Sequence, residues 1–74
     1  MRVTYDPSVD AAYIYLRGDS EASSHGYTYP CDPLEVHGMI NLDFDENDVL
    51  VGLEVLDASK RLSAAILALA EQPE

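Results

Sequence analysis

The chain has one cysteine, few basic residues and no long apolar segment, and each shortage restricts the class of protein it can belong to. Its 74 residues include one cysteine, Cys31, so no disulfide can form within the chain. Domains of this size bury only about 60% of the surface that they expose when unfolded, and many gain stability from a disulfide, a metal or a partner chain. With a disulfide excluded, a partner chain is favoured, and a lone cysteine fits a reducing compartment.

Basic residues are the second shortage. Four lysine and arginine residues stand against 14 aspartate and glutamate residues, which gives a formal net charge of −10. Such a surface repels the phosphates of nucleic acids and of anionic membranes, so we expect neither as a partner. The charge suits a basic protein partner or a cationic ligand, although acidity also keeps a small protein dissolved without any specific role.

Long apolar segments are missing as well. The longest nearly apolar run, residues 62–70, is far shorter than the roughly 20 residues that a membrane helix needs. Arg2 follows Met1 directly, and no apolar stretch of the kind found in signal peptides comes after it. From these features we predict a cytoplasmic protein that forms a single domain over residues 1–74.

What the chain does contain is the alternation of polar and apolar residues that is typical of β-strands. An irregular strand is expected between Glu21 and Tyr29, followed by a loop that begins with Pro30–Pro33 and ends at Gly38. Four segments alternate more clearly, and they pair into two hairpins: Arg2–Tyr5 with Ala11–Leu16, and Met39–Phe44 with Val49–Leu56.

A single helix is predicted from Ala58 to about Gln72, because alanine and leucine dominate this stretch. Asp57 precedes it, where a carboxylate can accept hydrogen bonds from the first free amides of the helix. The predicted fold is therefore α+β, with an antiparallel sheet of about four strands packed by one C-terminal α-helix. The residues expected to face the sheet are spaced as i, i+3, i+4 and i+7: Leu62, Ala65, Ile66 and Leu69.

This helix carries more apolar side chains than one face needs. Leu67 and Ala70 point away from the inward stripe, and Ser63 is the only polar residue between Leu62 and Ala70. A monomer is expected to show charge there, so we predict a homodimer in which a second subunit covers Leu62, Ile66, Leu67 and Ala70. The alternative is a monomer whose helix is coated with alanine.

The first group of candidate site residues surrounds the first predicted hairpin. Tyr13 and Tyr15 share one face of a strand, where they suit stacking on a ligand or a partner. Asp6 and Asp10 lie next to them, and paired carboxylates can perform acid–base chemistry when burial separates their pKa values. Aspartates beside turns more often cap the backbone.

The second group lies in the middle of the chain. His25, Cys31 and His37 are metal-ligating residue types, but their spacing of six residues matches no usual zinc pattern. We therefore predict no metal and no other cofactor. Cys31 with a histidine as its base is a candidate nucleophile, although each of these residues also suits a plain loop surface.

Five stretches of the chain match a familiar pattern: Val3–Pro7, Asp10–Ile14, Gly52–Ser59, Pro30–Pro33 and Met39–Asp45. The first three resemble the bacterial domain of unknown function family 2283, and the other two look like its actinobacterial branch. The chain departs from the family pattern before the last strand, where Asn47-Asp48 replaces an Asp-Gly turn. The resemblance implies a small stand-alone bacterial protein and brings no catalytic residues.

Two functional hypotheses follow. The first is a homodimeric protein-interaction module, antitoxin-like in size and acidity, that binds a basic partner. The second is a small enzyme or small-molecule-binding protein with its site on the sheet or at a dimer cleft. A pocket with convergent polar groups would favour the second hypothesis. Candidate residues for either are Asp6, Asp10, Tyr13, Tyr15, Cys31 and His37.

The acidic loop between the last two predicted strands generates a prediction about metal. Asp43, Asp45, Asn47 and Glu54 are spaced as in a calcium-binding loop. Asp48 stands where such a loop needs glycine, and the flanks alternate like strands. We therefore predict that calorimetric titration with calcium shows no saturable binding. A one-to-one micromolar site that Asp45→Ala abolishes would contradict this.

Overall fold

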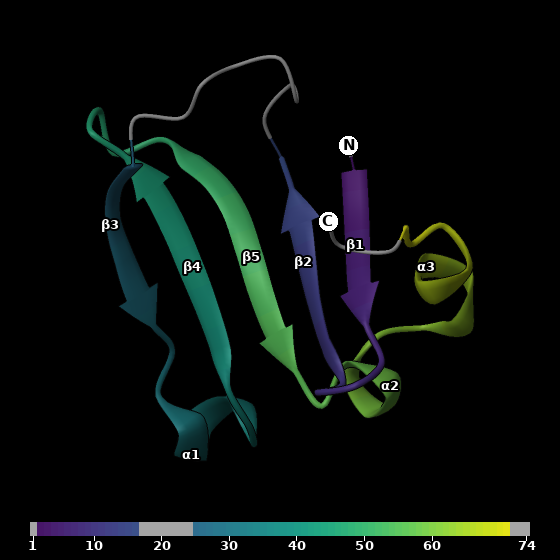
Figure 1. The fold of residues 1–74 in the computed structure, drawn as a ribbon. Coiled ribbons are helices and arrows are strands. Elements are labelled where there is room, and N and C mark those ends of the chain that lie inside the picture. Colours follow the sequence, from purple (N-terminus) through teal and green to yellow (C-terminus); the bar gives the residue numbers. More distant parts are fainter. Residues whose placement is uncertain (1, 17–24, 72–74) are drawn as a thin grey trace.

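The computed structural model describes residues 2–16 and 25–71, which form one antiparallel sheet with short helices on one side (Figure 1). The strand order is β1-β2-β5-β4-β3, so the α+β prediction is confirmed, with five strands in place of about four. The elements, in chain order, are β1 (Arg2–Asp6), β2 (Ala11–Tyr15), β3 (His25–Pro30), α1 (Pro33–Val36), β4 (Ile40–Asp45), β5 (Leu50–Leu56), α2 (Ala58–Arg61) and α3 (Ala64–Ala68).

Both predicted hairpins are present, and β5 joins them by pairing with β2 on one side and with β4 on the other. The predicted third strand is β3 from residue 25 onward, and its earlier part lies outside the described residues. α1 forms where a loop was expected. The Asp32 carboxylate accepts a hydrogen bond from the Leu34 amide at 2.9 Å, and Pro33 occupies the first turn, where its missing N–H costs nothing.

The β4–β5 turn forms without the glycine of the family pattern. Asp48 adopts a left-handed conformation there, with φ 64°, which aspartate tolerates better than most residues. The Asp45 carboxylate accepts from the amides of Asn47 at 2.8 Å and Val49 at 3.1 Å. Asp45 is buried, so this carboxylate serves the turn itself.

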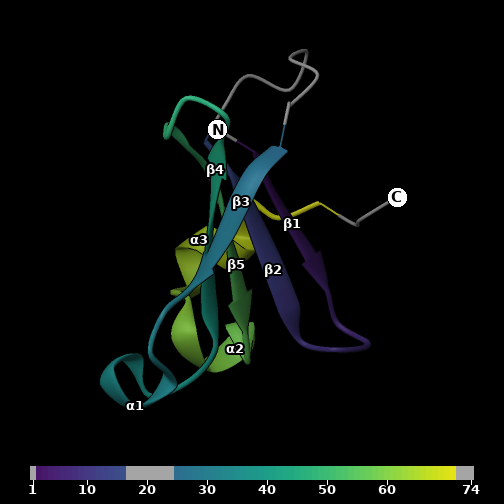
Figure 2. The same ribbon diagram turned by 90° about the vertical axis from the view of Figure 1, so that its left-hand side faces the viewer.

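The prediction of one continuous C-terminal helix is wrong. The chain forms α2 and α3 instead, with Leu62 in an extended conformation between them. The Ser63 hydroxyl then accepts from the Ile66 amide at 3.2 Å and caps α3. Figure 2 shows that both helices lie on the same side of the sheet. No helix of the described residues is long and apolar enough to cross a membrane.

The break between the helices lets the chain reach the outer edge of β1. The Tyr5 amide donates to the Glu71 carbonyl at 2.9 Å, and the Glu71 amide donates to the Val3 carbonyl at 2.8 Å. These bonds occupy backbone groups at an edge that would otherwise offer a template for other strands. A straight helix continuing past Glu71 has no free amide there, so the helix ends before this contact.

Asp57 does not cap the helix as the sequence predicted. It adopts a left-handed conformation with φ 54° and makes no side-chain capping bond. Asp10 performs this role from the β1–β2 turn: its two carboxylate oxygens accept from the amide and the hydroxyl of Ser59, at 2.9 and 2.8 Å. Tyr5 Oη donates to the same carboxylate at 2.7 Å. The hydrogen bond from Tyr5 and those from Ser59 lower the pKa of Asp10.

The helix layer covers only part of the sheet. α2 packs against β2 and β5, and α3 packs against β1. The buried apolar side chains gather in the same region: Val3, Ala12, Val51, Val55 and Ala58.

The predicted inward stripe of the helix is only half right. Leu62 and Ile66 are half-buried, but Ala65 is exposed and Leu69 is 64% exposed. Leu67 and Ala70, expected to point outward, are half-buried too, because the break at residue 62 rotates α3 relative to the continuous helix. The expectation that these two side chains stay exposed in a single subunit is therefore wrong.

Asp10 and Asp57 offer a matched pair of substitutions. Both residues adopt the left-handed conformation, which asparagine also tolerates. We predict that Asp10→Asn lowers the Tm by about 4–8 °C at neutral pH, since an amide replaces an acceptor of three hydrogen bonds, whereas Asp57→Asn is nearly neutral.

The pH dependence of this loss in Tm tests whether the charge of Asp10 causes it. Because the folded pKa of Asp10 lies below its ordinary value of 3.8, its stabilising effect is complete above that value and is lost as the pH falls through the folded pKa. Melting curves of the wild type and Asp10→Asn should therefore converge in acid. A constant gap at all pH values would show that the charge of Asp10 is not the cause.

Candidate functional site

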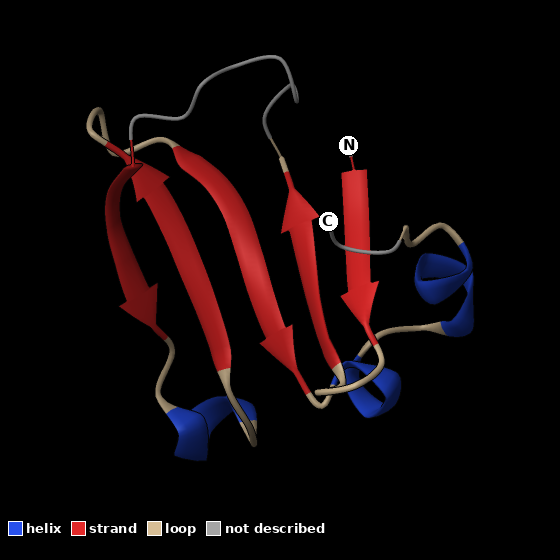
Figure 3. Cartoon of the chain, in the orientation of Figure 1, coloured by secondary structure: helices blue, strands red, loops and turns tan. Residues whose placement is uncertain are grey.

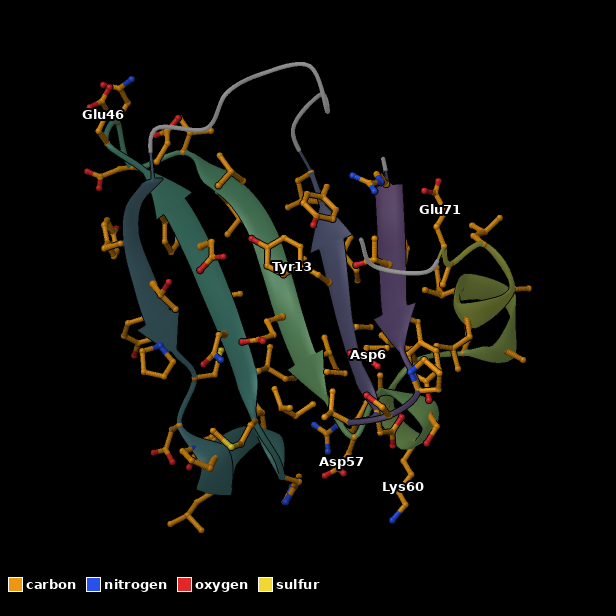
Figure 4. All side chains as sticks on the ribbon, viewed as in Figure 1. Asp6, Tyr13, Glu46, Asp57, Lys60 and Glu71 are labelled. Atoms are coloured by element: carbon orange, nitrogen blue, oxygen red, sulfur yellow. The ribbon has the colours of Figure 1, made fainter. Side chains whose placement is uncertain are left out.

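The face of the sheet opposite the helices carries a polar network and is called the open face below. It faces the viewer in Figure 4, where Tyr13 projects from it. Successive side chains of a strand alternate between faces, so paired positions on neighbouring strands share a face. Two rows of paired residues cross this face: Thr4, Tyr13, Glu54 and Asn41, and then Arg2, Tyr15, Gly52, Asp43 and Thr28.

Tyr13 lies across three strands of the open face. Its hydroxyl reaches from β2 over β5 and donates to Asp43 Oδ2 on β4. Thr28 Oγ1 donates to the other oxygen of Asp43 at 2.6 Å. Glycine at position 52 makes this possible, because a Cβ placed there would lie 2.6 Å from the Tyr13 ring. Burial first, and then the bond to Asp43, raise the pKa of Tyr13 well above its ordinary value.

A second aromatic ring lies beside the first. The ring centroids of Tyr13 and Tyr15 are 4.6 Å apart, with an angle of 54° between the planes. The Arg2 guanidinium carbon lies 5.1 Å from the Tyr15 ring centroid, within the range of a cation–π interaction. Arg2 Nε also lies 3.4 Å from a Glu71 carboxylate oxygen. The open face thus already holds one guanidinium group of its own chain.

A shallow pocket of about 330 Å³ opens beside these rings. Glu54 is one of its two lining carboxylates, and Asn41 Nδ2 donates to Glu54 Oε1 at 2.9 Å, which fixes one oxygen in place. Apolar groups of the first hairpin also line it. The lining residues are Thr4, Asp6, Val9, Ala11, Ala12, Tyr13, Tyr15 and Glu54.

Three of the predicted site residues meet at this pocket: Asp6, Tyr13 and Tyr15. Asp6 has a structural task as well, since its Oδ1 accepts from the Ser8 amide at 3.0 Å and from the Ser8 hydroxyl at 2.6 Å. Asp10 points away to Ser59, so the two aspartates form no carboxylate pair. Both aspartates bond backbone amides: Asp6 caps its own turn, and Asp10 caps the start of α2.

Cys31 and His37 lie apart from the pocket, on either side of α1. Cys31 is half-buried and its amide donates to the Ile40 carbonyl at 2.9 Å. His37 ends α1 in a left-handed conformation, and Arg61 donates to its carbonyl at 2.7 Å. Across residues 2–16 and 25–71, no three side chains of histidine, cysteine, aspartate or glutamate are grouped as metal ligands.

Four residues of the open face are not among the site candidates that the sequence predicted: Arg2, Asp43, Gly52 and Glu54. A signal was present, because Asp43 and Glu54 alternate with apolar neighbours along their strands and therefore had to share a polar face. What was missing was the strand order. Only the pairing of β2 with β5 and of β5 with β4 brings Tyr13 within reach of Asp43.

Comparison with known proteins gives one match. A family model described as a protein of unknown function (DUF2283) matches residues 2–59. This stretch includes all five strands and both residues of the Asp10–Ser59 contact. No curated protein and no solved structure matches the chain.

The raised pKa of Tyr13 generates a prediction about alkaline stability. Its protonated form is favoured in the folded state, so its contribution is complete below the ordinary tyrosine pKa of 10.0 and is lost as the pH rises toward the folded value. Urea unfolding should therefore show the wild type losing stability above pH 10.0 faster than Tyr13→Phe does.

Gly52→Ala is the companion variant, because its methyl group displaces the Tyr13 ring from Asp43. It is expected to destabilise the fold at neutral pH and to show the flatter alkaline profile of Tyr13→Phe. Tyr5 and Tyr27 also have raised pKa values, but they are present in all three proteins. Parallel profiles for the wild type and Tyr13→Phe would disprove the role of the Tyr13–Asp43 bond.

Proposed function

Since this chain belongs to the DUF2283 family of proteins of unknown function, we propose a function from its geometry: it is a homodimeric protein-interaction module whose open face binds a basic segment of a partner protein. The observation that carries the proposal is the tyrosine pair framed by carboxylates on the open face. A cytoplasmic, antitoxin-like role, in which the partner is a basic toxin, is the setting that size and charge favour.

The carboxylates of the open face are held in place before any partner arrives. Asp43 accepts from Tyr13 and Thr28, and Glu54 accepts from Asn41. An ionised carboxylate can accept about four hydrogen bonds, so each retains capacity for an incoming cation. Fixed acceptors lose little conformational entropy on binding, which favours recognition of a charged side chain.

The intrachain contact of Arg2 with Tyr15 is a small-scale example of the proposed recognition. The Arg2 guanidinium lies over the Tyr15 ring and beside the Glu71 carboxylate, and we expect a partner arginine to use the same two kinds of contact. The net charge of −10 adds a long-range attraction that speeds encounter with a basic surface.

A second candidate function is binding of a small cationic molecule. The pocket of about 330 Å³ lies at the lower end of the range for small-molecule sites. Its lining combines the apolar Val9 and Ala11 with the carboxylates of Asp6 and Glu54, which suits an amine or guanidine on a short carbon chain.

Fluorescence polarisation with a labelled arginine-rich peptide tests the first candidate. We predict saturable binding that weakens as salt is added, and no binding of an acidic peptide of equal length. Glu54→Gln should weaken binding about two- to tenfold. Arg2→Ala should strengthen it, because it frees the face of Tyr15.

Glu46→Gln is the matched control. It removes the same charge at the far corner of the sheet from Tyr13 (Figure 4), so binding should match that of the wild type. An equal loss of peptide affinity in both glutamine variants would show that the binding is unspecific charge attraction and would contradict the proposal. Free arginine that binds as tightly as the peptide would favour the small-molecule candidate instead.

A further inference from the structure

The apolar face of the sheet is half covered and half bare. α2 and α3 pack against β1, β2 and β5, and among the described residues no helix packs comparably on β3 or β4. Figure 3 shows α1 beyond the ends of these two strands and the other two helices near the opposite edge of the sheet, beside β1. Four residues of β3 and β4 on this face are called the bare half below: Tyr27, Tyr29, Leu42 and Phe44.

The bare half is aromatic and carries no charged side chain. Tyr27 and Phe44 stack with ring centroids 5.0 Å apart, and Tyr29 pairs with Leu42 in the next row. Tyr27 is 46% exposed and Tyr29 is 56% exposed. Asp48 borders this surface at the β4–β5 turn, where its carboxylate accepts from Tyr27 Oη at 3.2 Å. The four side chains themselves are uncharged in a chain with a net charge of −10, so the occupant of the bare half is expected to be mainly apolar.

The outer side of α3 is the second unpaired apolar surface. Ala65, Ala68 and Leu69 are exposed, and their i, i+3, i+4 spacing places them on one flank of the helix. None of them is charged. The chain therefore presents two uncharged surfaces on the same side of the sheet: a raised one on the helix layer and a recessed one on the bare half.

We infer that a second copy of this chain packs against this side, with the helix layer of each subunit seated on the bare half of the other. A twofold axis parallel to the strands exchanges the two halves of the sheet and turns the helix sides toward each other. The raised helix layer of one subunit then packs on the bare half of its partner, and the reverse contact is identical, as a self-complementary interface requires. This inference rests on the homodimer of the proposed function and names its surface.

The area that a stable dimer interface buries requires both the bare half and the helix flank. A stable interface buries about 800 Å² on each subunit, which is about a sixth of the accessible surface of 5023 Å². Two six-residue strands span only about 20 by 10 Å, so β3 and β4 alone do not suffice. The helix flank supplies additional contact, and the half-buried Leu62, Ile66, Leu67 and Ala70 beneath it complete the apolar layer.

Charge decides which side the two copies share. Contact through the open faces would bring Asp43 and Glu54 of both subunits together, and like charges oppose such an approach. Contact through the bare half and the outer flank of α3, whose side chains are uncharged, places the two open faces outward, on opposite surfaces of the dimer. Each open face then stays available for a basic partner.

Sedimentation equilibrium of the full chain is the first test. The expected result is a species of twice the 8.1 kDa chain mass. Tyr29→Glu and Leu69→Glu each bury a carboxylate in the interface, and each should raise the dimer dissociation constant at least about tenfold. Val49→Glu is the matched control, since Val49 is 50% exposed in the β4–β5 turn, and it should leave the constant unchanged.

Cross-linking tests the arrangement without relying on disruptive variants. In a Cys31→Ser background, a Tyr29→Cys chain mixed with a Leu69→Cys chain should be joined by a short bis-maleimide. A Val49→Cys chain should not be joined to the Leu69→Cys chain. Joining of 49 to 69 but not of 29 to 69 would overturn the arrangement.

The outcomes separate this inference from the basic-partner proposal. A chain that stays monomeric at high concentration, or a dimer that both glutamate variants leave unchanged, overturns the interface. If such a chain still binds the arginine-rich peptide, the open-face proposal stands. A dimer that cross-links as expected but binds no peptide overturns the open-face proposal and supports the interface.

Discussion

One carboxylate attaches the helix layer to the sheet. Asp10 holds the amide and hydroxyl of Ser59 at the start of α2, and its own carbonyl accepts from the Ala58 amide at 3.0 Å. Tyr5 ties the same carboxylate to β1. Because α2 begins at this contact, the helices lie behind β1, β2 and β5. The chain then runs to the outer edge of β1, where Glu71 bonds the backbone of that strand, and the described helices leave β3 and β4 uncovered. The uneven covering of the sheet is a consequence of where Asp10 lies.

Residue alternation was sufficient to predict four of the strands, because each has one apolar and one polar face and is bounded by turn residues. It was not sufficient for the sheet order, since β2 pairs with β5 across about forty residues of chain and no local signal encodes such a contact. The polar network of Tyr13, Asp43 and Gly52 depends on that order. The tyrosines were therefore found from the sequence, and the carboxylate and glycine that position them were not.

The C-terminal error has a different origin. High helix propensity in residues 58–72 favoured one helix, but propensity is a weak tendency that tertiary contacts override. Here the overriding contacts are the backbone bonds of Glu71 with β1, which a continuous helix cannot make. Ser63 was the available signal, because serine favours the position before a helix. Asp57 is a second example: it is a residue type that favours the position before a helix, but its conformation prevents a side-chain capping bond. Asp10, which is distant in sequence, caps the helix instead.

The proposed dimer gives the two faces of the sheet different tasks. A chain with 14 acidic and four basic residues repels its own copies, yet a domain with so few buried apolar side chains gains from a partner subunit. The structure separates these demands: carboxylates such as Asp43 and Glu54 lie on the open face, and the bare half carries none. A subunit that used the bare half for self-association would leave the carboxylates of the open face uncovered. Binding of a basic partner on the open face would then lower the net charge of the assembly and, through reduced repulsion between subunits, strengthen the dimer.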